Sequence, residues 1–212
     1  MRRALVLVEG ITDKPGYIED IVKASPIASN YDEIKRAKTE EFFDKKTPWY
    51  LKPFSKIDAV DKFADMKVFL KSHQGRVGAC RTVRFLIQRL QRDGYEVDVL
   101  SHSLGTIITL VCGPNLRNEA VVVKRLMLYA SPLGLAIPPL RAEIENFTRR
   151  YLRNFYTEEE QKYVYGTEDL VSKVYREESV GQILDLIRGK EETKKEIKAV
   201  KAGHSLSNLI HY

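Results

Sequence analysis

The chain has 212 residues, of which 43% are hydrophobic and 30% charged, and its formal net charge is +6. This length and composition are those of one globular domain with a sizeable core, and they exclude a low-complexity protein. No apolar run approaches the about 20 residues that span a bilayer, and acidic residues separate the basic ones, so neither an integral membrane segment nor a nucleic-acid-binding stripe is predicted.

The amino terminus and the cysteines bear on the compartment. Two arginines precede a run of only five apolar residues, 4–8, which is too short for a signal peptide. Cys80 and Cys112 lie far apart, outside any metal-binding spacing, and they suit a structural role in a reducing compartment. We therefore expect a cytoplasmic protein.

The first part of the chain predicts strands and a helix before a segment that is hard to interpret. Residues 4–8 form the continuous apolar run of a buried parallel strand, and residues 17–22 place apolar side chains at helical spacing. Residues 31–37 are a further candidate strand. Residues 65–70 fit a strand or a helix, because periodicity does not separate the two.

Residues 25–75 are a candidate cap-like insertion within a single domain that spans residues 1–212. Five aromatic residues gather there: Phe42, Phe43, Trp49, Tyr50 and Phe54. A solvated loop does not need so many. Two interpretations stay open, a local core or the apolar wall of a binding site.

The middle of the chain has clearer patterns. Residues 83–90 predict a helix that ends at Gly94, and residues 97–100 predict a buried strand. Residues 106–111 are apolar and β-branched, and they fit a strand or a buried helix. Residues 121–129 predict another strand, which two basic residues interrupt.

The remaining predicted elements continue the alternation. They are a helical face at 140–155, a capping box of Thr157 with Glu160, a short strand at 163–165, a helix at 180–187 and a last strand at 197–200. Strands that alternate with helices imply a mostly parallel central sheet with helices on both faces. Such sheets carry their sites at the carboxyl ends of the strands.

The strand at 97–100 stops in Ser101-His102-Ser103-Leu104-Gly105, where a second apolar run begins. So tight a corner needs small residues, and Ser101 and Gly105 flank Ser103 symmetrically. The stretch resembles the nucleophile elbow, G-x-S-x-G, of the α/β-hydrolase family, with serine in place of the first glycine. The resemblance implies that Ser103 is a nucleophile and that His102 packs as a structural residue. The alternative is a strand-to-helix corner with an unreactive serine.

Two later segments resemble the other parts of that family's catalytic triad. Gly166 and the loop after it follow a strand as the family's acid loop does, which implies that Asp169 is the acid, with Glu168 beside it as a rival. Gly203 and His204 follow the last strand, which implies that His204 is the base. The alternative for each residue considered alone is that Asp169 is a loop or N-cap acid and that His204 is a surface histidine. The order serine, aspartate, histidine is the family's order and favours the triad.

An oxyanion hole is also implied by the resemblance. One N–H comes from Leu104, the residue after the nucleophile, and the second comes from Ile11, next to Gly10. Glu9 stands where the family commonly has histidine. A carboxylate aimed at the hole would oppose a developing negative charge, so we expect Glu9 to point away or to pair with a lysine or arginine.

The resemblance implies a compact α/β-hydrolase fold that lacks the family's first strands. It implies a serine hydrolase, of the esterase, lipase or thioesterase kind, that cleaves a small-molecule carboxylic ester or thioester through an acyl-enzyme, with no cofactor and no metal. Two alternatives stay open: a catalytically weak binding protein on a hydrolase fold, and an acyltransferase that uses the same triad. The sequence leaves the substrate and the oligomeric state open.

Overall fold

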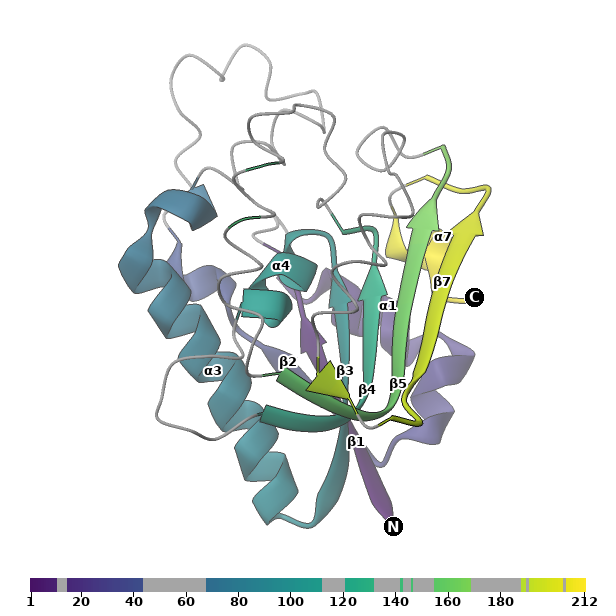
Figure 1. Cartoon of the computed structure of the whole chain (residues 1–212), viewed down its shortest axis with the longest axis horizontal. Coiled ribbons are helices and arrows are strands. Elements are labelled where there is room, and N and C mark those ends of the chain that lie inside the picture. Colours follow the sequence, from purple (N-terminus) through teal and green to yellow (C-terminus); the bar gives the residue numbers. More distant parts are fainter. Residues whose placement is uncertain are drawn as a thin grey trace.

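The described part of the chain forms strands and helices that pack around one central sheet (Figure 1). The computed structural model describes residues 1–10, 15–43, 68–111, 121–131, 142, 146, 155–168, 188–189, 191–203 and 205–212. Its strands are β1 (Arg2–Val8), β2 (Glu33–Ala37), β3 (Tyr95–His102), β4 (Val121–Tyr129), β5 (Phe155–Gly166), β6 (Arg188–Gly189) and β7 (Lys194–Val200). Its helices are α1 (Tyr17–Lys23), α3 (His73–Arg92), α4 (Leu104–Val111) and α7 (Leu206–Leu209), with short 3-10 helices η1 (Pro26–Asn30) and η2 (Glu40–Phe42).

The strands form one 7-stranded sheet in the order β2-β1-β3-β4-β5-β6, with β7 also paired to β5. Every pairing is parallel. The carboxyl ends of the strands therefore meet at one edge of the sheet, the upper edge in Figure 1. The strands predicted at 4–8, 31–37, 97–100, 121–129, 163–165 and 197–200 are all confirmed, and in the described part of the chain β2 forms one end of the sheet.

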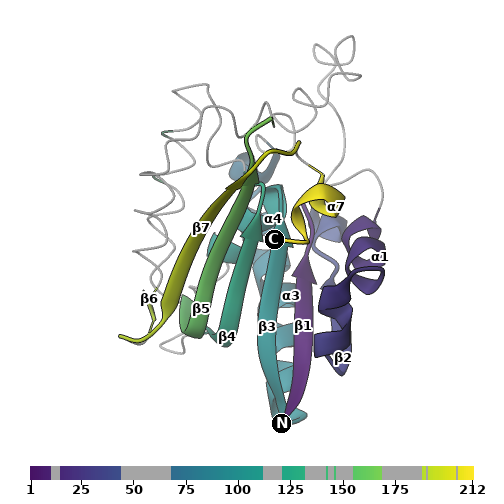
Figure 2. The same ribbon diagram turned by 90° about the vertical axis from the view of Figure 1, so that its right-hand side faces the viewer.

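Helices cover both faces of the sheet (Figure 2). Side chains alternate along β1, so Val6 and Val8 belong to a core with α3 and α4, while Leu5 and Leu7 belong to a second core with α1 and α7. The predicted fold class is confirmed by this arrangement. None of the described helices combines the length and the apolar character that crossing a membrane requires.

The ambiguous segment at 106–111 is helical, and all eight residues of α4 are buried. It connects two parallel strands, β3 and β4, and such a connection needs a crossover that is usually a helix. The helix predicted at 83–90 lies within α3, and Gly94 follows its end at φ 84°. In the other ambiguous segment, 65–70, the described residues 68–70 are helical.

The prediction of a capping box at Thr157 and Glu160 is wrong, as is the placement of Phe155 on a helix. All three residues lie in β5. Phe155 and Thr157 pair with residues of β4, and the buried Thr157 hydroxyl accepts a hydrogen bond from Gln161 Nε2 (2.6 Å). Strand pairing in the folded sheet outweighs a local capping signal. Ala142 and Asn146 are helical, whereas the rest of the predicted helical face at 140–154 and the helix at 180–187 lie outside the described residues.

The buried carboxylate of Asp98, in β3, connects β1, β4 and Tyr31, which precedes β2. It accepts hydrogen bonds from Arg3 Nη2 (2.6 Å), Tyr31 Oη (2.7 Å) and the Arg125 backbone N–H (3.1 Å). Arg125 follows the irregularity in β4 that begins at Val123, where the sequence predicted an interruption. The network lies away from the carboxyl edge of the sheet and has a structural role.

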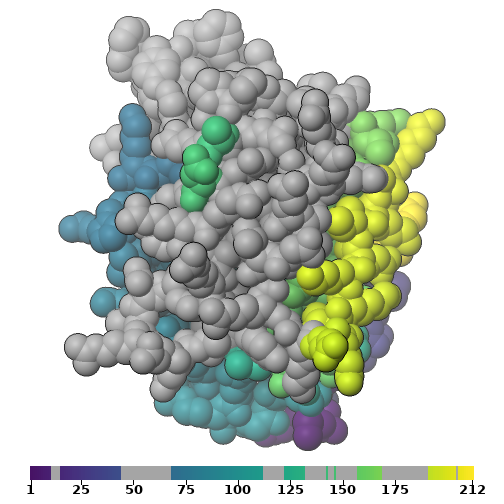
Figure 3. Space-filling model, in the orientation of Figure 1, coloured from purple at the N-terminus to yellow at the C-terminus, as the bar shows by residue number. Residues whose placement is uncertain are grey.

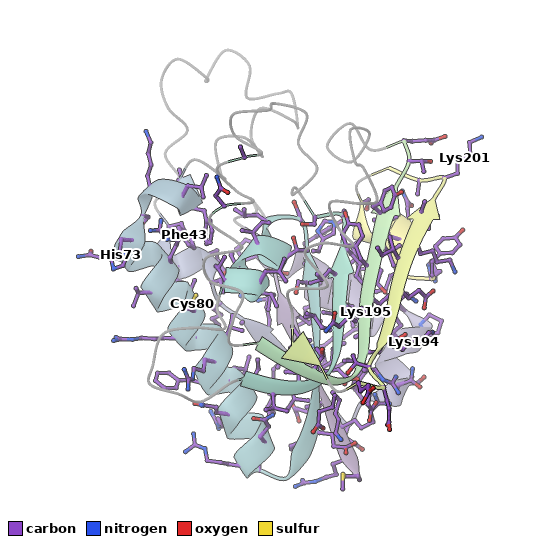
Figure 4. All side chains as sticks on the ribbon, viewed as in Figure 1. Phe43, His73, Cys80, Lys194, Lys195 and Lys201 are labelled. Atoms are coloured by element: carbon purple, nitrogen blue, oxygen red, sulfur yellow. The ribbon has the colours of Figure 1, made fainter. Side chains whose placement is uncertain are left out.

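The strand β7 lies on the flank of the molecule opposite α3 (Figure 3). Lys194 and Lys195 stand at its start and Lys201 just beyond its end, and all three are exposed (Figure 4). Within the described residues β7 pairs with β5 alone. Lysines on an edge strand disfavour pairing with another chain, so this edge is protected against sheet extension.

Candidate active site

Ser103 lies at the corner between β3 and α4, at the carboxyl edge of the sheet. Its φ is 53°, in the left-handed region that a non-glycine residue seldom adopts. The conformation is held from both sides. The Ser103 N–H donates to the carbonyl of Tyr129 at the end of β4 (3.0 Å), and the Ser103 carbonyl accepts from the Thr106 N–H (3.0 Å). This strained, anchored corner is the geometry expected of a nucleophile elbow.

The small residues that flank Ser103 have separate structural reasons. A Cβ at position 105 would lie 2.1 Å from the carbonyl oxygen of Val8, so only glycine lets α4 pack on the end of β1. The Ser101 hydroxyl is fully buried and lies 2.7 Å from Thr109 Oγ1 of α4. Serine in place of the family's first glycine therefore adds a hydrogen bond across the corner.

Ser131, just after β4, also supports the corner through Thr106 of α4, and neither residue was predicted to do so. Thr106 Oγ1 lies 2.7 Å from the carbonyl oxygen of Ser103 and 2.6 Å from Ser131 Oγ, and both side chains are buried. Ala130, directly before Ser131, has a φ of 47°. No sequence pattern marks Ser131 as part of this corner, because only the parallel pairing of β3 with β4 brings the end of β4 beside Ser103.

Two of the residues predicted for the oxyanion hole are brought together. A Cβ at Gly10 would lie 3.3 Å from the backbone nitrogen of Leu104 and 3.1 Å from its Cβ. The backbone at the end of β1 thus passes directly against the amide that follows Ser103. Ile11, the predicted second donor, lies outside the described residues.

Glu9 is paired, as the sequence analysis expected. Its carboxylate is only 1% exposed and lies 3.0 Å from Arg36 Nη1. It also accepts hydrogen bonds from the backbone N–H groups of Gly16 (3.0 Å) and Ile18 (2.9 Å). Burial opposes the charge on Arg36, but hydrogen bonds and charge from Glu40, with those from Glu9, raise the Arg36 pKa above its usual value. The Glu9 carboxylate is therefore paired, and it shares Arg36 with Glu40, whose Oε1 lies 2.5 Å from the same Nη1.

The segments that lead to the predicted acid and base run side by side. The Thr167 N–H donates to the carbonyl of Val200 (2.7 Å), and the Glu168 N–H donates to the carbonyl of Ala202 (3.0 Å). At Gly166 the approach is so close that a Cβ would lie 2.2 Å from the Ala202 oxygen. Asp169 and His204 themselves lie outside the described residues, and the rival acid Glu168 is exposed. The choice between Asp169 and Glu168 stays a prediction.

Within the described part of the chain, the other histidines and cysteines form no metal site. His102 is buried, at 5% exposure, in keeping with the predicted structural role. His73 begins α3, and the free, half-buried Cys80 lies two turns along it (Figure 4). The described residues include no cluster of histidine, cysteine, aspartate and glutamate that suits a metal ion. Cys112 lies outside the described residues.

The aromatic segment is described only in part. Phe43 is buried and packs against Phe69 with ring centroids 5.7 Å apart. Phe42 is 40% exposed, and its ring lies so close to α3 that a Cβ at Gly78 would be 2.2 Å from it. These two side chains pack locally against α3 and the helical turn around Phe69. Trp49, Tyr50 and Phe54 lie outside the described residues.

Solved structures of other proteins have a fold similar to that of this chain. No family model and no curated protein matches the chain. A structure of the metagenome-derived lipolytic enzymes LipS and LipT matches with a TM-score of 0.58 at 10% identity, over 98% of this chain and 87% of that one. Arabidopsis thaliana SOBER1 matches with a TM-score of 0.51 at 17% identity, over 98% and 93%. TT1662 from Thermus thermophilus matches with a TM-score of 0.50 at 12% identity, over 97% and 82%.

The sheet order, the serine corner between β3 and α4, and these structural neighbours agree with one another. The chain has the α/β-hydrolase fold. At these levels of identity the likeness concerns the fold, and the chemistry is argued from the chain's own residues.

Proposed function

We propose that the protein is a serine hydrolase that cleaves a small-molecule carboxylic ester or thioester through an acyl-enzyme. Ser103 is the nucleophile, His204 the base and Asp169 the acid. The observation that carries the proposal is the backbone of Ser103, held at φ 53° on the corner between β3 and α4. Strain of this kind is retained where it serves a function, here the presentation of a hydroxyl at the carboxyl edge of the sheet.

The proposed reaction has two steps, acylation of Ser103 and hydrolysis of the acyl-enzyme. The Ser103 oxygen attacks the acyl carbon while His204 takes the hydroxyl proton, and the oxyanion is stabilised by backbone N–H groups of Leu104 and Ile11. The tetrahedral intermediate collapses, and the alcohol or thiol leaves with the proton from His204. A water then attacks the acyl-enzyme by the same route, which releases the acid and restores Ser103. Asp169 orients His204 and stabilises its charged form.

A carboxylate directed at the oxyanion hole would favour the alternative of a weakly active binding protein, and Glu9 is the residue that could supply it. Its contacts with two backbone N–H groups and with Arg36, which also pairs with Glu40, support the hydrolase over that alternative. The same pairing leaves the approach of Gly10 to the Leu104 amide undisturbed. The proposal includes a cytoplasmic location, which the free thiol of Cys80 supports.

A fluorophosphonate probe tests the proposed function directly. We expect the probe to label the wild-type protein and not the Ser103→Ala variant, because only an activated serine displaces its leaving group at a useful rate. Ser101→Ala, two residues away, is the matched control and should still be labelled. A wild-type protein that stays unlabelled while folded would favour the binding-protein alternative. Products formed with added alcohols, in place of the free acid, would favour acyl transfer.

The part of the candidate cap (residues 25–75) that lies outside the described residues gives a prediction about substrate size. If Trp49, Tyr50 and Phe54 line the acyl site, each added methylene of the acyl chain should contribute about 0.8 kcal/mol, a few-fold in kcat/KM, until the site is full. A series of p-nitrophenyl esters of rising chain length measures this. Trp49→Ala should flatten the series, while Phe85→Ala, which removes an aromatic ring 56% exposed on α3, should not. A series that is flat in the wild type would leave these aromatic residues as local core.

A further inference from the structure

We propose that Glu9 is a positioning residue for the oxyanion hole: its buried carboxylate holds the end of β1 in the direction that brings Gly10 against the Leu104 amide. The inference rests on the proposed function. It adds Glu9 to the proposed active site, as a residue separate from the nucleophile, the base and the acid. It concerns the residue at which this chain departs from the family pattern, where glutamate stands in the place of histidine.

The strand pairing that aligns β1 ends just before Glu9. Val8 is the last residue of β1 with partners in the sheet, Ala37 on β2 and Ser101 on β3. From Glu9 onward the ladder no longer sets the direction of the backbone. Other contacts must set it, and they must do so next to the proposed oxyanion hole.

The side chain of Glu9 supplies those contacts on one side. Three donors converge on its carboxylate: Arg36 Nη1 from β2 and the backbone N–H groups of Gly16 and Ile18 at the start of α1. With 1% of the residue exposed, these charge-assisted hydrogen bonds are shielded from water and strong. They tie the end of β1 to β2 and to the start of α1.

The backbone around Glu9 is fitted to α4 on the other side. A Cβ at Gly105 would lie 2.1 Å from the Val8 oxygen and 2.8 Å from the Glu9 carbonyl carbon, and a Cβ at Gly10 would lie 3.3 Å from the Leu104 nitrogen. The Glu9 carbonyl accepts a hydrogen bond from Thr39 Oγ1 (3.2 Å). A rotation at Glu9 would therefore move Gly10, and the residue after it, relative to Leu104.

The test compares Glu9→Gln with Asp98→Asn. Each substitution replaces a buried carboxylate that accepts three hydrogen bonds, one of them from an arginine side chain, but Asp98 lies in the network away from the carboxyl edge. In Glu9→Gln, an amide N–H₂ replaces one of the accepting oxygens and faces N–H donors, so at least one of the three hydrogen bonds is lost. We expect Glu9→Gln to lower kcat about ten- to hundredfold with little change in KM, since a shift of about 1 Å at a catalytic group costs about that much. Asp98→Asn should leave kcat within about twofold of wild type while lowering the Tm, because its network has a structural role only.

A transition-state mimic gives an independent readout. Phenylboronic acid, which forms a tetrahedral adduct with the serine oxygen, should bind Glu9→Gln more weakly by the same factor by which kcat falls. Glu9→Asp keeps the charge but is too short to reach all three donors, so its kcat should lie between those of the wild type and Glu9→Gln. This variant serves if Glu9→Gln does not fold.

The outcomes separate the two proposals. Wild-type protein without Ser103-dependent hydrolysis would refute the proposed function and this inference with it. Wild-type protein that hydrolyses an ester, together with folded Glu9 variants whose kcat and boronate affinity match those of Asp98→Asn, would refute this inference alone.

Discussion

Replacement of Ser103 by alanine is expected to lower kcat by about 10⁴-fold or more on any ester that the wild type cleaves. The residual rate would reflect only substrate binding and the oxyanion hole. His204→Ala and Asp169→Asn should each cause a loss of comparable size. Combined substitutions should add little, because the three residues act as a unit in one proton-transfer step. Steady-state kinetics of the single, double and triple variants measure this.

Ser101→Ala is the matched control for Ser103→Ala. It removes a buried serine hydroxyl from the same corner, with loss of the hydrogen bond to Thr109, so it should lower the free energy of unfolding by about 1 kcal/mol. Its kcat should stay near that of the wild type. Wild-type turnover by Ser103→Ala, or losses that multiply across the triad variants, would contradict the mechanism.

Gly166→Ala should disrupt the proposed site from a distance. A Cβ there would lie 2.2 Å from the Ala202 oxygen and 2.6 Å from the Gly203 oxygen, and backbone atoms cannot yield as a flexible side chain does. The ends of β5 and β7 must separate, which moves the segments that lead to Asp169 and His204 apart. We expect a loss of about 1–3 kcal/mol in the free energy of unfolding. We also expect kcat to fall about a hundredfold, as for a misplacement of about 1 Å.

Gly203→Ala tests whether that effect comes from the close contact. Gly203 directly precedes His204, yet a Cβ there would meet no atom of the described residues within 4 Å, and its φ is not in the left-handed region. This variant should keep the wild-type free energy of unfolding within about 0.5 kcal/mol. Denaturant unfolding and ester hydrolysis, measured on both glycine variants, decide the matter. Equal effects at positions 166 and 203 would show that the proximity of β5 to β7 is not the cause.

The features of the candidate site that depend on neighbours along the chain could be predicted from the sequence, and those that depend on distant residues could not. Ser103 is marked by its own neighbours, because a tight corner needs small residues two positions before and after it. The Glu9 prediction also succeeded, since a carboxylate near a developing oxyanion has few tolerable arrangements. Its partners Arg36, Gly16 and Ile18 could not be named, because they come from β2 and α1, which meet Glu9 only in the folded chain. The capping box at Thr157 failed for the opposite reason: a local signal was present, and pairing with β4 outweighed it.

The sequence by itself determined the described strands, the parallel sheet and the position of the serine corner, because hydrophobic periodicity and small residues act over a few neighbours along the chain. Only the tertiary structure decided that 106–111 is a helix and that Ser131, at the end of β4, contacts Thr106 beside the corner at Ser103. It also decided that Gly166 must be glycine because β5 and β7 nearly touch there. These features depend on atoms far apart in sequence, and their distances are set by the packing of the whole sheet.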